Sequence, residues 1–301
     1  MKKAIWITAT IMVVSLLCTV CFGVALGSQG IQSLISQDWD QKITYWSQHI
    51  HNIGNALDVI DDFTDVDAEN MPKLNEQIAE LPLSNDFYIR MDCGEVIVKR
   101  GTGDKIIAKL EQFSWNTEET RNLVLAITND NTLAVSYPKG WNGIRARLTV
   151  TIPHEITTLD ITVGAGELEL EDITATTLSA HVKAGDVSLE RVTVKTATVH
   201  ADIGEIEIDG DTRAEESLIV TSDCGNVEFD IPRTAPFVLD FQVETGDIKI
   251  DTETERLHNA KIQRAATGGN GYLFRNDTGK DVKCHILITV KLGDLKIDEA
   301  D

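Results

Sequence analysis

A glycine-centred phrase that recurs about every twenty residues constrains this chain more than any other feature. In each copy, alternating apolar residues lead to a glycine, an acidic or amide residue follows, and two apolar residues then flank a polar one. Five copies lie between Leu159 and Ile250, centred on Gly166, Gly185, Gly204, Gly225 and Gly246. Such a period is typical of stacked supersecondary units, because one unit cannot bury its apolar face alone.

Two short strands per repeat follow from the alternation of apolar and polar positions around each glycine. Residues seven, five and three before the glycine, and two and four after it, are mostly apolar. The glycine lies where the alternation reverses, which is typical of a corner that needs a positive φ or a close approach of coils. Strands in the same phase would pair in parallel at about 4.8 Å. The pattern therefore predicts an all-β fold, a parallel β-solenoid with about 20 residues per coil.

The solenoid coils occupy residues 159–250. The residues on either side of these coils predict the two ends of the stack. Two outlying copies of the phrase are centred on Gly94 and Gly293. Residues 87–158 are expected to form N-terminal capping strands, because terminal repeats are usually atypical. Residues 251–301 are expected to form C-terminal closing strands, packed on the last coil at the far end. The individual strands are expected near residues 105–113, 121–128, 132–137, 144–152, 282–292 and 295–297.

An uncharged apolar run of 24 residues, from 4 to 27, predicts a transmembrane helix. At 1.5 Å per residue it would be about 36 Å long, enough to span a bilayer. A cleaved signal peptide is the alternative, but the run exceeds the usual length of its apolar region. Lys2 and Lys3 make residues 1–3 a cytoplasmic head. We therefore expect a single-pass protein of the cell membrane with its C-terminal domain extracytoplasmic.

Residues 28–86 predict an acidic helical stalk or linker. Apolar residues spaced by three and four between Ile31 and Ile60 indicate an amphipathic helix. Its apolar face would pack on the solenoid end or on a second copy of the chain, and partner docking is the alternative. The acidic segment that follows predicts a solvated linker with one short helix at 73–80.

Composition narrows the classes of partner. The formal net charge is -21, which excludes nucleic acid as the expected partner, because phosphate binding needs an excess of lysine and arginine. Cys93, Cys224 and Cys284 show no paired spacing, so no disulfide framework or zinc ribbon is indicated. Cys93 and Cys224 both precede a glycine and are expected to be small buried hydrophobes, with a redox role as the alternative.

Outward positions of the coils are rich in acids. A solvated face that keeps the solenoid soluble is the simpler interpretation. Weak binding of Ca²⁺ or Mg²⁺ between coils is the alternative, since hard cations favour oxygen ligands. No other cofactor is expected. The candidate ligands are Glu167, Asp186, Glu205, Asp202, Asp223 and Glu244.

His181 and His200 both lie four residues before their glycine, so they should be neighbours on the outer surface. With Thr162, Thr221 and Gln242 they are expected to form a polar ladder. A metal-binding pair is the alternative, although the sequence places no third histidine or cysteine beside them.

The sequence contains no Gly-x-Ser-x-Gly, His-Glu-x-x-His or phosphate-loop motif. A carbohydrate-active β-helix enzyme is an alternative, because some β-helices cleave polysaccharides. Its carboxyl groups would have to lie about 5–10 Å apart around one bond, whereas here the acids are spread along a ladder. We therefore expect no catalysis.

The segment Val150-Thr-Ile-Pro153, followed by coils with Gly-[Asp/Glu]-[Ile/Val/Leu]-x-[Ile/Leu] behind an N-terminal span, resembles the toastrack, or "putative adhesin", domain family. The resemblance covers about Phe87 to Asp298. It implies a β-solenoid at the bacterial cell surface with no catalytic residues to carry over. LiaG-like members are associated with an envelope-stress system. The expected function is a non-catalytic adhesin or scaffold for an envelope protein or wall polymer, with an accessory role in stress sensing as the alternative.

Overall fold

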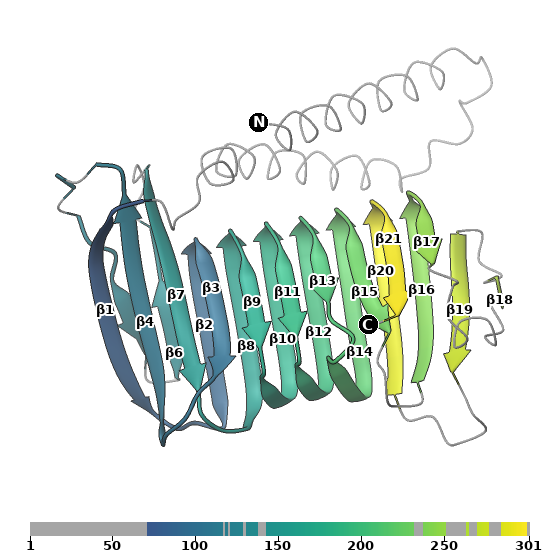
Figure 1. The fold of residues 1–301 in the computed structure, drawn as a ribbon, viewed down its shortest axis with the longest axis horizontal. Coiled ribbons are helices and arrows are strands. Elements are labelled where there is room, and N and C mark those ends of the chain that lie inside the picture. Colours follow the sequence, from purple (N-terminus) through teal and green to yellow (C-terminus); the bar gives the residue numbers. More distant parts are fainter. Residues whose placement is uncertain are drawn as a thin grey trace, which may run out of the picture. The chain divides into compact units, whose positions relative to one another are not determined.

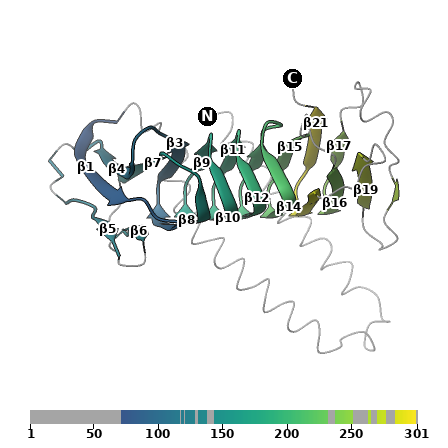
Figure 2. The same ribbon diagram turned by 90° about the horizontal axis from the view of Figure 1, so that it is seen from below.

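The computed structural model describes residues 71–299, apart from gaps at 117, 120, 129–130, 138–142, 232–236, 251–262, 265–269 and 277–283. These residues form two β-sheets of ten and eleven strands. The strands of each sheet follow one another along a single axis (Figure 1), and the two sheets face each other (Figure 2). None of the described residues belongs to a helix long and apolar enough to cross a bilayer. The predicted head, transmembrane helix and stalk helix lie outside the described residues.

Each coil contributes one strand to each sheet, here called sheet A and sheet B. In spatial order sheet A contains β1 (Lys73–Pro82), β4 (Lys105–Ser114), β7 (Ile144–Ile152), β3 (Glu95–Arg100), β9 (Leu168–Glu171), β11 (Val187–Glu190), β13 (Ile206–Ile208), β15 (Val227–Ile231), β21 (Leu295–Glu299) and β17 (Ile248–Ile250). Sheet B contains β18 (Gln263–Arg264), β19 (Asn270–Asn276), β16 (Phe237–Thr245), β20 (Cys284–Leu292), β14 (Arg213–Cys224), β12 (Thr193–Ile203), β10 (Thr174–Ala184), β8 (Ile156–Ala165), β2 (Asp86–Cys93), β6 (Thr132–Val135) and β5 (Leu125–Ile127).

The predicted parallel register is confirmed. Ala180 of β10 is in register with Val199 of β12, and Val199 with Val220 of β14. All three side chains are at most 1% exposed, as are most of the equivalent positions in the other coils. Burying one apolar side chain is worth about 1.5–3 kcal/mol, so the narrow interior between the sheets holds the stack together. The all-β solenoid expected from the repeat is therefore present.

Glycine forms the corner at which each coil passes from sheet B to sheet A. Gly166 and Gly185 both have a φ of 128°, which L-residues rarely adopt. The N–H of Gly166 donates to the carbonyl of Ala184 at 2.8 Å, and that of Gly185 to the carbonyl of Ile203 at 2.8 Å. These bonds link neighbouring coils through the corner. A positive φ, between 120° and 146°, is also found at Gly94, Gly204, Gly225, Gly246 and Gly293.

The N-terminal cap corrects the expected end of the linker. Residues 73–82, expected to be linker with a short helix at 73–80, instead form strand β1, antiparallel to β4. Leu74, Ile78 and Leu81 have helical spacing, but the free edge of β4 offers backbone partners that a strand can satisfy. The β-structure therefore begins at Lys73 rather than near Phe87.

The other capping strands agree better with the sequence. The expected strands at 105–113 and 144–152 are confirmed as β4 and β7, which pair antiparallel. Those at 121–128 and 132–137 are present as shorter strands, β5 and β6. The cap extends both sheets beyond the coil of β2 and β3, so residues 87–158 cover that end of the stack as expected.

The C-terminal strands correct the expected closure of the far end. Strands β20 and β21, coloured yellow in Figure 1, lie between the coil of Gly225 and the coil of Gly246. β20 pairs in parallel with β14 on one side and β16 on the other. The chain returns into the stack because every coil offers the same parallel register to a neighbour. Among the described residues, β17 and the hairpin of β16 with β19 and β18 form the far end instead.

Candidate functional site

The outer faces of the two sheets differ in chemistry. Sheet A presents acids along its central strands, β9 to β15. They are Glu169, Glu171, Glu190, Glu207, Asp209, Glu228 and Asp230. Over the corresponding strands β8 to β14, sheet B presents mainly hydroxyl and imidazole groups. They include Thr162, Thr177, Ser179, His181, Thr196, Thr198, His200 and Thr221. The solenoid therefore offers one strongly acidic face and one mostly neutral, hydrogen-bonding face.

Three of the acids predicted to bind cations lie at the glycine corner. Glu167, Asp186 and Glu205 follow the glycines of three successive coils. Oδ1 of Asp186 accepts a hydrogen bond from the backbone N–H of Glu205 at 2.8 Å. Asn226 and Asp294 accept from the next coil in the same way, at 3.0 and 2.9 Å. A short Asp or Asn at this position thus satisfies a backbone donor between coils, a structural role that sequence reasoning missed.

The like charges at this corner act on one another. Partial burial of its carboxyl group raises the pKa of Glu167, and the negative charges of Glu95, Asp186 and Glu169 add to that shift. Arg147, which pairs with Glu95 at 2.6 Å, opposes it. The corner is a region of negative potential in which a cation would relieve repulsion. Binding of Ca²⁺ or Mg²⁺ there stays a prediction.

The other three predicted acids lie on sheet B, and the structure does not bring all six together. Asp202 and Asp223 lie beside the histidines on β12 and β14. Glu244 lies on β16, and the insertion of β20 places Lys291 between Asp223 and Glu244. Nζ of Lys291 lies 2.8 Å from Oδ1 of Asp223. The acidic row that the sequence suggested is therefore interrupted by a cation.

The histidine ladder is confirmed in its central part. His181 and His200 are in register, with ring centroids 4.8 Å apart and planes inclined by 7°. Thr162 and Thr221 continue the row on either side. Gln242 is not the next member, because Thr289 of the inserted strand β20 lies between it and Thr221.

A carboxylate joins the two imidazoles. Nε2 of His181 lies 2.8 Å from Oδ1 of Asp202, and Nε2 of His200 lies 3.4 Å from the same oxygen. Oδ1 of Asp223 lies 3.3 Å from Nε2 of His200. The hydrogen bond that His200 donates to Asp223 raises the pKa of His200. Asp202 was predicted to belong to an acidic row. It lies on the same strand as His200 and diagonally across from His181 on the neighbouring parallel strand, so it contacts both imidazoles.

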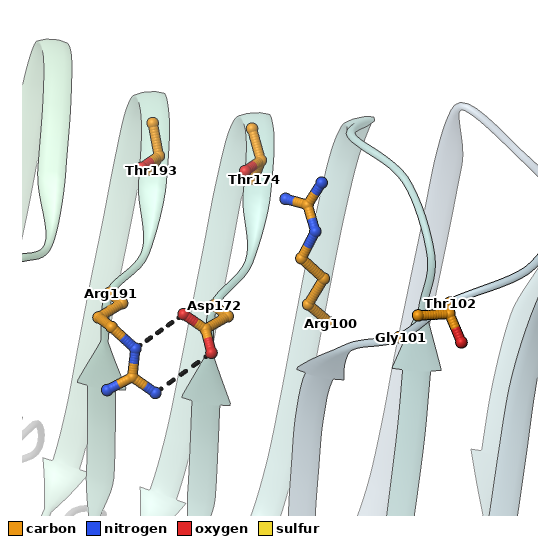
Figure 3. Close-up of a pocket in the computed structure, with 7 residues that line it drawn as sticks. All are labelled: Arg100, Gly101, Thr102, Asp172, Thr174, Arg191 and Thr193. Atoms are coloured by element: carbon orange, nitrogen blue, oxygen red, sulfur yellow. Dashed lines mark hydrogen bonds and ion pairs between the residues drawn. The ribbon is translucent and has the colours of Figure 1, made fainter.

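The corner at the opposite edge of the coils holds a shallow hollow of about 510 Å³ (Figure 3). It is lined by Arg100, Gly101, Thr102, Asp172, Thr174, Arg191 and Thr193. Arg100, Asp172 and Arg191 all lie six residues after their glycine, so charges alternate from coil to coil. The threonine hydroxyls and the guanidinium groups could hold a carboxylate or a sugar hydroxyl. This alternation was readable from the repeat alignment, but the position was overlooked.

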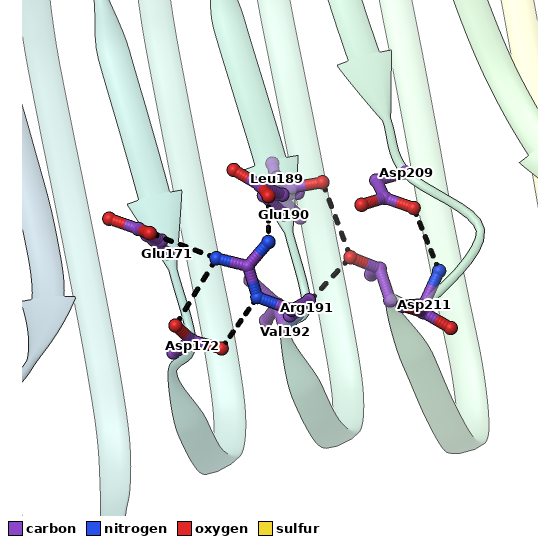
Figure 4. Close-up of polar contacts among 9 residues, drawn as sticks. Glu171, Asp172, Leu189, Glu190, Arg191, Val192, Asp209 and Asp211 are labelled. Atoms are coloured by element: carbon purple, nitrogen blue, oxygen red, sulfur yellow. Dashed lines mark hydrogen bonds and ion pairs between the residues drawn. The ribbon is translucent and has the colours of Figure 1, made fainter.

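Arg191 is the centre of an ion-pair cluster at this corner (Figure 4). Its Nε lies 2.7 Å from Oδ1 of Asp172, its Nη2 lies 2.9 Å from Oε1 of Glu171, and Glu190 also pairs with it. The hydrogen bond from Arg191 lowers the pKa of Asp172. Both Asp172 and Arg191 have a φ of 54°, the left-handed region. These ion pairs link two neighbouring coils at a turn with a strained backbone, and the charged groups of the cluster are paired with one another.

Cys93 fits the expected role of a small buried hydrophobe, and Cys224 fits it only in part. Cys93 and Cys284 are buried and Cys224 is half-buried, and all three are free thiols. Burial raises the pKa of Cys93 to about 12 and that of Cys284 to about 11. Thiolates are therefore disfavoured at neutral pH, and a thiolate is the reactive form.

Comparisons with known proteins identify a family model that matches the chain and solved structures of low sequence identity. The model of the family described as Toastrack DUF4097 matches residues 86–212 and 155–283, together more than half of the chain. A "putative cell adhesion protein" from Clostridium sporogenes is 11% identical with a TM-score of 0.45, covering 76% of this chain and 100% of its own. A "putative adhesin" from Bacteroides fragilis is 15% identical with a TM-score of 0.42, covering 74% and 97%. No curated protein matches the chain.

Proposed function

This chain belongs to the Toastrack DUF4097 family, and we propose that it is a non-catalytic interaction scaffold, an adhesin-like protein of the cell envelope. In this proposal residues 4–27 span the cell membrane once and residues 28–70 form an acidic stalk. The β-solenoid then stands outside the cytoplasm and displays its outer faces. The scaffold requires no cofactor and has no nucleic acid among its partners.

The observation that carries the proposal is the straight columns of like side chains on the outer faces. Thr162, His181, His200, Thr221 and Thr289 occupy one column of sheet B, in register from strand to strand. The spacing is that of neighbouring strands, about 4.8 Å. Such a column repeats one hydrogen-bonding position along the axis, which suits a partner that is itself extended, such as a wall polymer.

The charge difference between the faces favours sheet B as the binding face. Carboxylates dominate the outer face of sheet A along β9 to β15, and they would repel anionic polymers. Sheet B offers hydroxyl and imidazole groups, which pair with sugar hydroxyls or amides without a charge penalty. We therefore assign the partner to sheet B and a solubilising role to sheet A.

An accessory role in envelope-stress sensing is the second candidate, favoured by the amphipathic pattern of residues 31–60. That pattern suits contact with another membrane protein or with a second copy of the chain. A carbohydrate-active enzyme is a third and weaker candidate. The carboxylate that lines the hollow, Asp172, and its neighbour Glu171 are both ion-paired with Arg191 rather than placed on either side of a bond.

Photo-crosslinking in whole cells tests the proposal. A photoreactive residue replaces Thr198 on sheet B, Glu207 on sheet A, or Ile43 in the expected stalk. Thr198 and Glu207 are both exposed and belong to the same coil, so they form a matched pair. We expect Thr198 to capture a wall polymer, seen as a mass shift that glycan-cleaving enzymes remove.

The outcomes separate the candidates. Equal capture by Thr198 and Glu207, or none by either, would refute the assignment to sheet B. Capture of a membrane protein by Ile43 alone would favour the sensing role. Turnover of a wall glycan by the purified full chain would contradict the non-catalytic proposal.

A further inference from the structure

Three metal-ligating side chains converge on the outer face of sheet B. His200 and Asp202 lie two residues apart on β12, so alternation places both on the same face. His181 on β10 is in register with His200. One ligand atom from each of the three residues lies within 4.8 Å of the other two. The parallel register of two adjacent coils thus assembles a set that no single segment contains.

The separations suit a bound ion. Protein nitrogen and oxygen ligands lie about 2.0–2.2 Å from Zn²⁺. Two ligands at that distance, in tetrahedral or octahedral geometry, are about 3–3.5 Å apart. Oδ1 of Asp202 lies 2.8 Å from Nε2 of His181 and 3.4 Å from Nε2 of His200. The two rings are stacked with planes inclined by only 7°, so both must tilt toward each other before all three atoms can bind one ion.

We propose that His181, His200 and Asp202 bind a divalent transition-metal ion, with Zn²⁺ as the first candidate. Two imidazole nitrogens and one carboxylate oxygen favour zinc, nickel or copper over the hard cations calcium and magnesium. Three protein ligands leave further coordination positions open to water or to a donor from a partner. The site is therefore distinct in chemistry from the acidic corner of Glu167 and Asp186.

Neighbouring charged groups complete the environment. Oδ1 of Asp223 lies 3.3 Å from Nε2 of His200 and is held by Lys291 at 2.8 Å. Lys183 is the residue of β10 in register with Asp202. Two carboxylates and two lysines therefore surround two imidazoles, and a divalent cation would add charge to a nearly balanced cluster. Asp223 offers a fourth ligand, because it contacts Nε2 of His200, the atom that the metal would bind.

The same cluster can hold protons in place of a metal. In the absence of an ion, Nε2 of His181 donates to Asp202, so its ring proton occupies the position that the metal would take. Binding requires Nε2 to be unprotonated, with the remaining ring proton on Nδ1. Metal uptake should consequently weaken as pH falls and imidazolium forms. A cluster that served only as a proton-linked ladder would take up no metal at any pH.

Zinc titration of the purified full chain in detergent tests the proposal. Calorimetry after chelator treatment measures the number of Zn²⁺ ions bound and their affinity. We expect the variants His181→Asn, His200→Asn and Asp202→Asn each to lose one equivalent or to weaken it at least tenfold. His154→Asn and His285→Asn are the matched controls, being histidines of the same solenoid outside the cluster, and should bind as the wild type does.

A second readout separates ligation from folding. Co²⁺ in place of Zn²⁺ should give visible absorption bands that shift in the three cluster variants but not in the controls. Melting of each metal-free variant should match that of the wild type, because the replaced side chains are partly exposed. The proposal is overturned if the wild type binds no Zn²⁺, or if the double variant His181→Asn/His200→Asn binds as many ions as tightly.

Discussion

A Cβ atom on Gly185 would lie nearer than 3.0 Å to the carbonyl oxygen of Gly166, the matching glycine of the preceding coil. The same collision recurs along the column, so these positions combine a positive φ with an absence of space. Neighbouring coils can approach to strand-pairing distance at this corner only because a side chain is missing.

Gly185→Ala should therefore destabilise the protein by about 3 kcal/mol or more, the sum of backbone strain and overpacking. Gly103→Ala is the control, because Gly103 also has a positive φ but would place its Cβ in open space. It should cost only about 1–2 kcal/mol. Denaturant unfolding of the two variants measures the difference. Equal losses would mean that the close approach of coils is not the cause.

The inserted position of β20 predicts a specific pattern of crosslinks. Thr221 and Thr289 lie on adjacent strands, as do Thr289 and Gln242, whereas Thr221 and Gln242 are two strands apart. Pairs of cysteines at adjacent positions should react with a crosslinker that spans about 5 Å, since that is the strand spacing. Mass spectrometry of the crosslinked peptides reads the result. A link between residues 221 and 242, with none to 289, would restore the closing role expected from sequence.

The acidic corner predicts a dependence of stability on pH. The folded-state pKa of Glu167 is raised by partial burial and by Glu95, Asp186 and Glu169. The folded chain therefore binds this proton more readily than the unfolded chain, and this contribution to stability falls as pH rises through the carboxylate range. Glu167→Gln should stabilise the protein at pH 7 by only a few tenths of a kcal/mol, because solvent still reaches this partly buried carboxylate and screens the repulsion. Unfolding at pH 4.5 and pH 7 should show the gain only at the higher pH, and a loss at pH 7 would contradict the repulsion.

Calcium and magnesium test the cation-binding prediction at the same corner. A site with a Kd of about 1 mM would add about 1.4 kcal/mol of stability at 10 mM ion, enough to raise the melting temperature by a few degrees. Glu167→Gln and Asp186→Asn should abolish the rise, and Asn at 186 keeps an acceptor for the N–H of Glu205. Glu244→Gln, beyond Lys291, is the control. A melting temperature that stays flat from zero to 10 mM would rule out the site.

The ion-pair cluster at the opposite corner predicts a salt-sensitive loss. Arg191→Gln removes the cation that lies among Glu171, Asp172 and Glu190 and leaves three carboxylates close together. The melting temperature should fall by a few degrees at low salt and by less at 1 M NaCl, where exposed charges are screened. Arg191→Asn should be less harmful than Arg191→Gln, because Asn tolerates the left-handed φ of this position. If Arg191→Asn and Arg191→Gln lower the melting temperature equally, backbone strain is not a cause. If the loss is the same at low salt and at 1 M NaCl, charge repulsion is not a cause.

Much of the solenoid was predictable because its rules are local. The alternation around Gly166 and Gly185 decides which side chains face the core, and the equal spacing of the copies decides that His181 lies beside His200. Strand β1 was missed because the acidic segment predicted a linker with one short helix, while the edge of β4 that the strand covers cannot be read from its own sequence. Asp202 was assigned to an acidic row because its diagonal contact with His181 depends on side-chain directions rather than on spacing.

The sequence by itself determined the period of the coils, the inward and outward faces of the repeat strands and the position of every corner glycine of the repeat. These features follow from a two-residue alternation of apolar and polar positions and from the need for a residue without a side chain at each corner. Both can be read directly from the sequence. Only the tertiary structure decided which coil lies next to which, and hence that Lys291 separates Asp223 from Glu244. Every coil presents the same parallel ladder of backbone donors and acceptors, so the repeat alone does not determine which coils are adjacent. The packing of the whole stack determines that order.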